Sequence, residues 1–200
     1  MEKLKLIVST ILVLFLAANL LSRQPMDIIQ SSNQAVIDIL SKKTRISGET
    51  ESKLLKIIDR ITSFNQIAKN VTTRFCMKLS KSQCAQFNRI FIELLRISSL
   101  KKMGRYRADR FKYLEQKIVG NKAVVRTIAY YESEEVQLDY HLQKPDKGAW
   151  QIVNYIIDDI DTIRNYRKQF RRLFAKYSFD KVMERLNRKI KQYQQENQKG

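Results

Sequence analysis

The 200-residue sequence is poor in the residues that build metal centres and irregular structure. It contains 2 Cys, 1 His, 5 Gly and 2 Pro. So few sulfur and imidazole ligands argue against zinc or iron–sulfur chemistry, and we expect no metal and no cofactor. The low glycine and proline contents exclude collagen-like and low-complexity classes. The sequence also lacks the P-loop, the G-x-S-x-G elbow and the H-E-x-x-H motif, so nothing in it favours an enzyme.

Hydrophobic residues and positive charge are abundant instead. Hydrophobic residues make up 44 % of the chain, which excludes intrinsic disorder and is enough for one domain with its own core. We expect that domain to span residues 23–193, with a polar tail at 194–200. Lys and Arg outnumber Asp and Glu by 38 to 20, giving a net charge of +18. Such an excess predicts an anionic partner, which by charge alone is a nucleic acid, an anionic membrane surface or an acidic protein.

The first 22 residues have the pattern of a secretory signal peptide. Lys3 and Lys5 precede an apolar run over residues 6–21, which is shorter than the ~20 residues of a membrane-spanning helix. The cleavage site is poor, because Leu16 or Leu20 stands where a small residue is preferred, so a retained anchor is the alternative. Because an exported protein leaves the compartment that holds nucleic acid, export favours an anionic membrane surface or an acidic protein as the partner. It also places Cys76 and Cys84 in an oxidising compartment, where they form either a disulfide or two buried thiols.

Hydrophobic periodicity changes twice along the chain. Apolar residues at helical spacing predict helices over about 28–40, 49–61 and 64–76 and after the capping-box pair Ser80 and Gln83. Alternating and β-branched segments then predict strands over about 110–119, 123–131, 136–142 and 150–157. The remainder returns to the helical period. We therefore predict an α+β fold with N-terminal helices, an antiparallel meander of about four strands and C-terminal helices.

Three groups of residues are candidates for chemistry. Asp158, Asp159 and Asp161 crowd the junction between the last predicted strand and the next helix, where capping explains them best. His141 falls on the polar face of its strand, which favours an exposed or hydrogen-bonded histidine over a catalytic one. The apolar face of the sheet either fills a core or lines a cavity for a hydrophobic ligand, and periodicity alone favours the core.

Motifs in the second half of the chain resemble the toluene-tolerance (ABC-transporter auxiliary) family of MlaC-like proteins. That family has a Trp that opens a strand of aliphatic residues and then, after an acidic turn, the pattern Asn-Tyr-Arg-x-Gln-Phe; here these are Trp150 and residues 165–170. Further likenesses are Phe64, the Ser82-Gln83 pair with Phe87 and Phe91, the Val125-Arg126-Thr127 strand and the strand over 136–142. Asp159 departs from the usual Gly, Asp161 from the usual Ser and Asn154 from a common Asp, so the chain resembles a divergent member.

This resemblance implies a periplasmic phospholipid carrier with a fold similar to nuclear-transport-factor-2-like (NTF2-like) domains. Such a carrier holds acyl chains in an apolar pocket between sheet and helices. It shuttles lipid between an outer-membrane lipoprotein complex and an inner-membrane ABC transporter with its substrate-binding subunit, and no nucleic acid is involved. The lipid-contacting residues that we predict on this basis are Phe91, Leu95, Leu138, Tyr140, Ile152, Ile156, Tyr166 and Phe170. For Arg167 a structural role, tying the last long helix to the sheet, is the alternative to ligand contact.

Three alternatives stay open at this point. The carrier could transport another apolar lipid, such as a hopanoid. The chain could instead be a membrane-anchored adaptor with a solid core and a basic surface. A small enzyme on the same fold would require a polar cavity that contains Asp139, His141 or Asp158.

Overall fold

The computed structural model describes residues 24–41, 48–105 and 107–199. The elements in chain order are α2 (Pro25–Leu40), α3 (Glu49–Ile61), α4 (Phe64–Cys76), α5 (Lys81–Arg105), β1 (Arg110–Val119), β2 (Lys122–Tyr131), β3 (Glu134–Gln143), β4 (Gln151–Ile157), β5 (Ile160–Asp161), α6 (Thr162–Lys176) and α7 (Phe179–Lys199). The predicted α+β organisation is confirmed. The predicted signal peptide lies outside the described residues. Within them, no helix combines the length and the apolar character needed to cross a membrane.

The sheet is an antiparallel meander in the order β1-β2-β3-β4-β5. It has one strand more than expected, because the two-residue β5 folds back on β4 and pairs Ile157 with Ile160. The two-residue turn between them is Asp158-Asp159, whose φ angles are 45° and 63°. A tight hairpin turn of the I′ type requires positive φ at both of these positions. Asp159 therefore keeps a left-handed conformation where glycine is usual in the family that this chain resembles.

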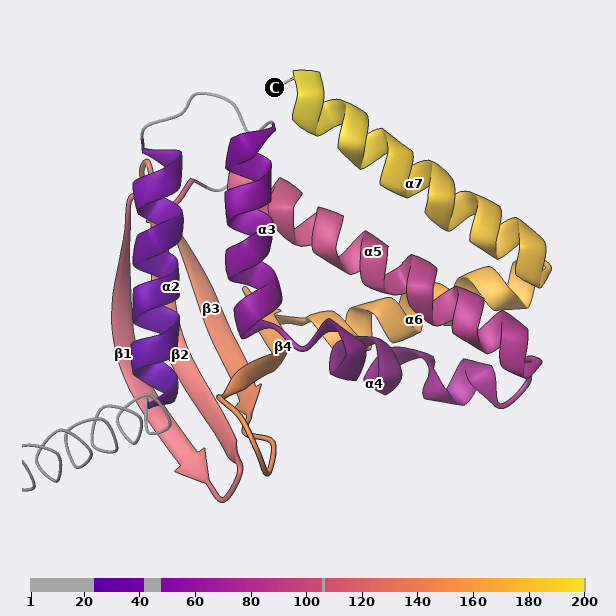
Figure 1. The fold of residues 1–200 in the computed structure, drawn as a ribbon, viewed down its shortest axis with the longest axis horizontal. Helices are drawn as coiled ribbons and strands as arrows, with labels where there is room; N and C mark the ends of the chain where they lie inside the picture. The colour runs from indigo at the N-terminus through magenta and orange to yellow at the C-terminus, as the bar shows by residue number, and fades with distance from the viewer. Residues whose placement is uncertain (1–23, 42–47, 106, 200) are drawn as a thin grey trace, which may run out of the picture.

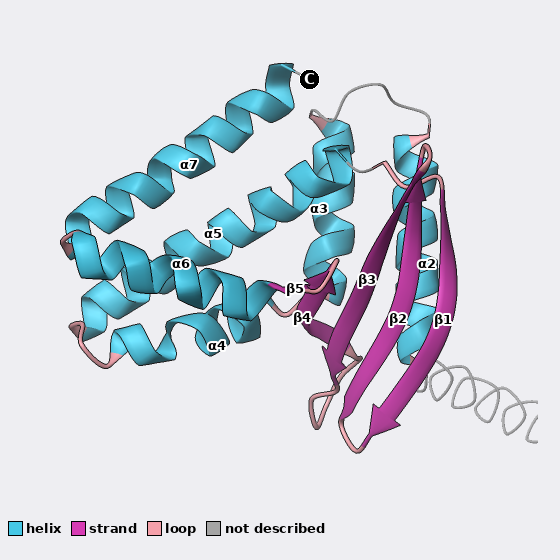
Figure 2. Ribbon diagram, turned by 180° about the vertical axis from the view of Figure 1, so that it is seen from behind, coloured by secondary structure: helices cyan, strands magenta, loops and turns pink. Residues whose placement is uncertain are grey.

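Of the described helices, α2 and α3 pack on one face of the sheet, and α4, α5, α6 and α7 form a separate layer. Figure 1 shows α2 in front of β1 and β2 and α3 beside α2 with its end at β4, whereas α4, α5, α6 and α7 stack beyond the β4 edge. From behind, in Figure 2, the opposite face of β1, β2 and β3 lies in view, and none of the described helices crosses it. The junction between α3 and α4 is held to the sheet by the Ser63 backbone N–H, which donates to the Ile152 carbonyl at 2.9 Å.

The hydrophobic interior is divided into three clusters rather than one. The largest lies among α4–α7 and is centred on fully buried Phe87, Phe91 and Phe170, whose rings pack edge to face. A second joins α2 to the sheet. The third joins α2, α3 and α5 through Leu40, Leu54 and Leu100, one from each helix. Most of the apolar burial is thus beside the sheet and not on it.

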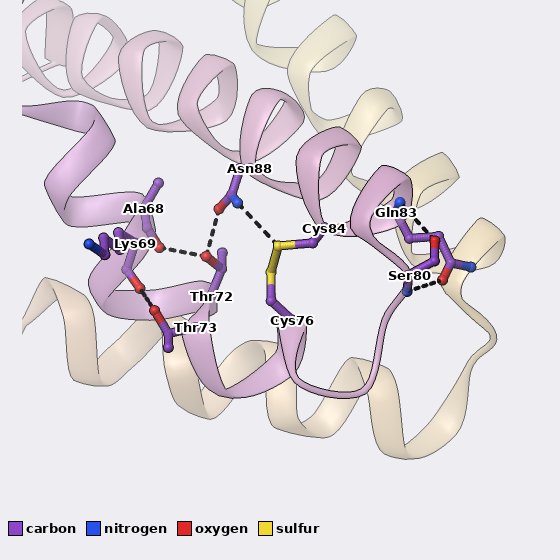
Figure 3. The surroundings of a disulfide bond; sticks show 9 residues. All are labelled: Ala68, Lys69, Thr72, Thr73, Cys76, Ser80, Gln83, Cys84 and Asn88. Atoms are coloured by element: carbon purple, nitrogen blue, oxygen red, sulfur yellow. Dashed lines mark hydrogen bonds between the residues drawn. A yellow bond between two sulfur atoms is a disulfide. The ribbon is translucent and has the colours of Figure 1, made fainter.

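Cys76 and Cys84 are joined in a disulfide between the end of α4 and the start of α5, with an S–S distance of 2.04 Å (Figure 3). Asn88 links the same two helices one turn further on. Its amide group donates to Cys84 Sγ at 3.4 Å, and its Oδ1 accepts from the Thr72 hydroxyl at 2.6 Å. The bond closes a short connection within the helical layer, away from the sheet.

The helix ends agree with the capping residues in the sequence. Ser80 and Gln83 form the reciprocal pair of a capping box, in which each side chain accepts from the other residue's backbone N–H. At the start of α6, Asp161 Oδ1 accepts from the Arg164 backbone N–H at 2.8 Å, so Asp161 acts as a cap, as predicted. The segment predicted as a polar tail is helical, because α7 continues through residue 199.

Candidate functional site

An apolar cavity of about 180 Å³ lies between the sheet and the helices that cover it. Val36 and Ile37 of α2 and Ile58 and Ile61 of α3 form its helical wall. Its floor comes from the inward face of the sheet, and its far end from the last turns of α5. The floor residues include Phe111, Ala129, Val136, Leu138, Tyr140 and Ile152.

One side chain that faces this space from the middle of the sheet is small: Ala129 of β2. Residues of β2 that point inward include Thr127 and Ala129, and Ala129 is paired with Phe111 on β1 and Val136 on β3. The cavity lies where the α2–sheet cluster and the α2–α3–α5 cluster fail to meet.

A short polar chain crosses the cavity wall. The Tyr140 hydroxyl donates to Asn33 Oδ1 at 3.2 Å, and the Asn33 amide donates to the Tyr113 hydroxyl at 3.3 Å. Burial raises the pKa of Tyr140 above its usual value, and burial also raises that of Tyr113. All three groups are therefore neutral hydrogen-bonding groups at physiological pH, and they hold α2 against β1 and β3 without placing a charge in the cavity.

Four of the eight predicted contact residues belong to the sheet, and three of these line the cavity. They are Leu138, Tyr140 and Ile152. Ile156 instead lies on the opposite face, paired with Asp139. The reason is a bulge in β4: the register shifts between His141 and Leu142, so the alternation of β4 reverses after Ile152.

The other four predicted residues lie on α5 and α6. Phe91, Leu95 and Phe170 are at most 1 % exposed and belong to the helical cluster, so they do not line the cavity. Their helical spacing correctly predicts that they are buried, but it does not predict which elements cover them. Tyr166 borders a neighbouring polar hollow. Arg167 donates through Nε to the Asn70 carbonyl at 2.9 Å, so it ties α6 to α4 and not to the sheet.

The cavity also has lining residues that the sequence reasoning missed. On the sheet they include Phe111, Ala129 and Val136, and also Tyr155 and Ile157, which the β4 bulge turns inward. On α5 they are Ser99, Lys102 and Met103, at the end of a 25-residue helix whose first half belongs to the helical cluster. The spacing of three and four residues along α5 could have predicted that Ser99, Lys102 and Met103 share a face. A β-bulge has no clear signature in a single sequence, so the inward direction of Tyr155 and Ile157 could not have been predicted.

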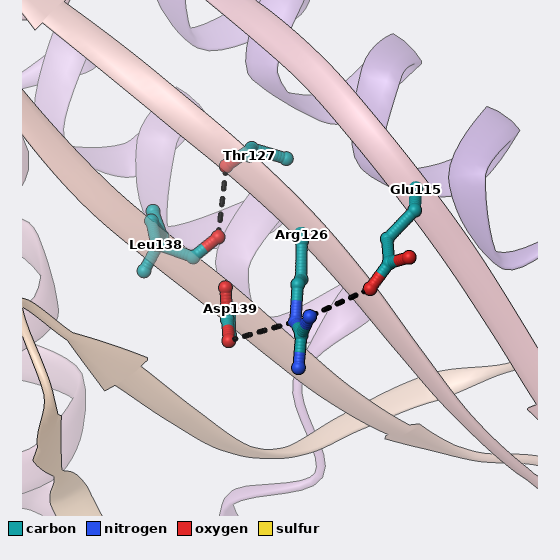
Figure 4. A network of polar contacts seen from close by, with 5 residues as sticks. All are labelled: Glu115, Arg126, Thr127, Leu138 and Asp139. Atoms are coloured by element: carbon teal, nitrogen blue, oxygen red, sulfur yellow. Dashed lines mark hydrogen bonds and ion pairs between the residues drawn. The ribbon is translucent and has the colours of Figure 1, made fainter.

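The polar residues considered for an enzyme lie outside the cavity. Asp139 is on the opposite face, 8 % exposed, where Arg126 Nε lies 3.4 Å from its Oδ2 and Arg126 Nη1 lies 2.7 Å from Glu115 (Figure 4). His141 borders a hollow on that same face, beside α4. Asp158 is in the β4–β5 turn, where its Oδ1 accepts from the Gln137 backbone N–H at 2.9 Å. In the described part of the chain, no group of acidic, His or Cys residues could hold a metal ion.

Comparison with known proteins identifies the family to which the chain belongs. The model of the MlaC protein family matches residues 30–188. The chain belongs to the MlaC family. That match runs from the first part of α2 through the whole sheet and α6 into the first half of α7, so every residue that lines the cavity lies within it.

A solved structure has the same fold as this MlaC-family chain. It is a phospholipid-binding protein from Ralstonia solanacearum, in complex with a phospholipid, and it is 17 % identical with a TM-score of 0.63. The alignment covers 83 % of this chain and 96 % of the other. Among curated proteins, no significant match was found.

Proposed function

We propose that this chain is a phospholipid carrier that holds acyl chains in the cavity between α2, α3 and the sheet. The observation that carries the proposal is the cavity itself, whose surface is mostly apolar although a few polar side chains border it. It occurs in a fold similar to that of a protein solved with a phospholipid. Each buried CH₂ contributes about 0.8 kcal/mol, so a dry cavity is what a carrier needs to remove acyl chains from water.

The cavity must widen to accept a whole lipid. A dry apolar cavity of about 150 Å³ binds a molecule the size of benzene, and this cavity of about 180 Å³ is similar. It holds a segment of one acyl chain. Entry of two chains separates α2 and α3 from the sheet, and the burial of the acyl chains supplies the free energy for that movement.

The proposal includes a location and exchange partners. The predicted signal peptide exports the chain to the periplasm. There it receives and delivers lipid at an inner-membrane ABC transporter with its substrate-binding subunit and at an outer-membrane lipoprotein complex, as the family resemblance implies. Exposed Lys168, Arg171 and Arg172 on α6 support attraction to an anionic membrane surface.

Native mass spectrometry of the protein purified without detergent tests the proposal. We expect an adduct of phospholipid mass, which solvent extraction then identifies. An adduct of hopanoid mass would change the cargo class. A clean apo mass, with no lipid gained from phospholipid vesicles, would contradict the carrier function and favour the adaptor alternative.

A matched pair of variants locates the lipid. Ala129→Phe places a ring in the cavity, whereas Ile128→Phe adds a ring to the opposite face of the same strand. We expect Ala129→Phe to lose the adduct and Ile128→Phe to keep it, with both variants folded by circular dichroism. Equal lipid content in the two variants would place the lipid elsewhere.

A further inference from the structure

The positive charge of the chain is concentrated in the helical layer formed by α4, α5, α6 and α7. Residues 64–105 and 162–199, which contain these four helices, have 21 Lys and Arg against 4 Asp and Glu. Residues 110–161, from β1 to β5, have 7 against 9. The molecule is therefore electrically asymmetric, and a negatively charged surface attracts the helical layer and not the sheet.

The helical layer ends in a tip on the side away from the sheet. Figures 1 and 2 both show the α4–α5 connection and the α6–α7 connection at that end. The two connections are held close together, because Phe75 near the end of α4 stacks on Phe174 near the end of α6, with 5.5 Å between the ring centres. We call residues 74–81 and 176–181 the helical tip.

The helical tip presents positive charge that is mostly unpaired. It contains one acidic residue, Asp180, and five exposed basic residues, which are Arg74, Lys78, Lys81, Lys176 and Lys181. Lys181 forms an ion pair with Glu184. None of the other four basic residues is paired with a carboxylate of the described chain, so each is available to an anionic surface.

An exposed apolar side chain lies within this basic tip. Met77 is 78 % exposed, the highest value for a large hydrophobic residue in the described chain. Its neighbours Phe75 and Leu79 pack against the interior of the helical layer instead. The disulfide between Cys76 and Cys84 closes the connection on which Met77 stands, so Met77 is held at the surface of the tip.

We propose that the helical tip docks on an anionic lipid bilayer, with Met77 inserted among the lipids and the four unpaired basic residues against their headgroups. Charge complementarity supports this occupant, because each Lys or Arg near such a surface raises binding about fivefold. An apolar side chain among basic ones is also typical of surfaces that insert shallowly into a bilayer. The residues of the tip line neither the apolar cavity nor three further hollows of the described chain, and a bilayer, unlike a protein segment, requires no groove.

Docking through the helical tip leaves the cavity clear of the bilayer. The cavity lies between α2, α3 and the sheet, at the other end of the molecule from the tip (Figure 1). Docking and uptake of a ligand are therefore separate events that use different residues. This inference goes beyond the proposed carrier function and does not depend on it, so either can fail without the other.

The test measures binding to two kinds of vesicle by co-sedimentation. One is an equimolar mixture of phosphatidylglycerol and phosphatidylcholine, and the other is phosphatidylcholine alone. The protein is the chain recovered after export, with the same N-terminus in every variant. The charge variant combines Lys78→Gln, Lys81→Gln and Lys176→Gln. Its control removes the same charge from exposed residues of the segment that contains the sheet, through Lys112→Gln, Lys117→Gln and Lys147→Gln.

We expect the charge variant to bind the phosphatidylglycerol vesicles about a hundredfold more weakly than the wild type. The control should change binding by less than about threefold, because its lysines are distant from the bilayer and screened by salt. Met77→Ser should weaken binding about fivefold. Val119→Ser, which changes a residue of β1 that is 66 % exposed, is the matched control and should have no effect. Circular dichroism checks that every variant is folded.

Three results would overturn the proposal. An equal loss in the charge variant and its control would mean that net charge and not the tip determines binding. Equal binding of the wild type to both kinds of vesicle would exclude a dependence on anionic lipid. No binding of the wild type to either vesicle would overturn the membrane assignment and leave an acidic protein as the partner of the tip. The lipid adduct seen by native mass spectrometry should be the same in all variants, which distinguishes a failure of docking from a failure of lipid carriage.

Discussion

The Tyr140 hydroxyl donates a hydrogen bond to Asn33 Oδ1 at 3.2 Å, across 107 positions of sequence. It joins the first described helix to the middle strand of the sheet at the wall of the apolar cavity. Because the surroundings are apolar, this bond and its continuation to Tyr113 fix where α2 lies on the strands.

Removal of the Tyr140 hydroxyl should loosen α2. In Tyr140→Phe the buried Asn33 Oδ1 loses its donor, and we expect the free energy of unfolding to fall by about 1–2 kcal/mol in a urea titration. Tyr130→Phe, on the opposite face of the sheet, is the control and should change it by less than about 0.5 kcal/mol. Equal effects in the two variants would show that the bond to Asn33 does not hold the helix.

A charge on the cavity floor should abolish lipid binding. Leu138→Asp places a carboxylate among apolar side chains, where an acyl chain would desolvate it. His141→Ala, on the other face of the same strand, should leave lipid binding intact. Lipid transfer from fluorescent vesicles measures both. Loss of transfer in His141→Ala with retention in Leu138→Asp would instead favour an activity on the outer face.

The disulfide should stabilise the chain without shaping the cavity. Its loop is short, since the two cysteines are 8 positions apart, and closure of such a loop contributes about 2–3 kcal/mol through the unfolded state. Replacement of Cys76 and Cys84 by Ser should lower the thermal midpoint, as measured by calorimetry. Lipid content should not change, because neither cysteine lines the cavity. A loss of lipid at a temperature where the variant remains folded would contradict this separation.

Relief of the left-handed turn should stabilise the β4–β5 hairpin. Asp159 has φ 63°, a conformation in which glycine avoids the strain of a side chain. We expect Asp159→Gly to raise the free energy of unfolding by about 0.5 kcal/mol, after allowance for the greater freedom of glycine in the unfolded chain. Asp159→Ala removes the carboxylate but keeps the strain, so it should not be stabilising. A gain in Asp159→Ala equal to that in Asp159→Gly would point to charge and not to backbone conformation.

Much of the fold could be predicted from periodicity, because each element carries one apolar face. The helix over 64–76, for example, has the bounds expected from its spacing. The residues of the site were harder to predict than the fold. Leu138 and Ile152 follow the alternation of their strands and point to the cavity. Ile156 has the same alternation in the sequence, but the β4 bulge turns its side chain to the opposite face. Phe91 and Phe170 have the spacing of buried residues, but spacing does not say which helix or strand covers them.

The largest apolar cluster stands beside the cavity and does not surround it. Apart from Ile58, Met103 and Tyr155, which belong to both, the side chains that hold the helical layer together are therefore different from those that line the cavity. Substitutions among the residues of the cavity wall change what fits there at little cost to the aromatic interior of α4–α7. A lineage can adapt such a protein to a new lipid in small steps, each passing through a folded intermediate.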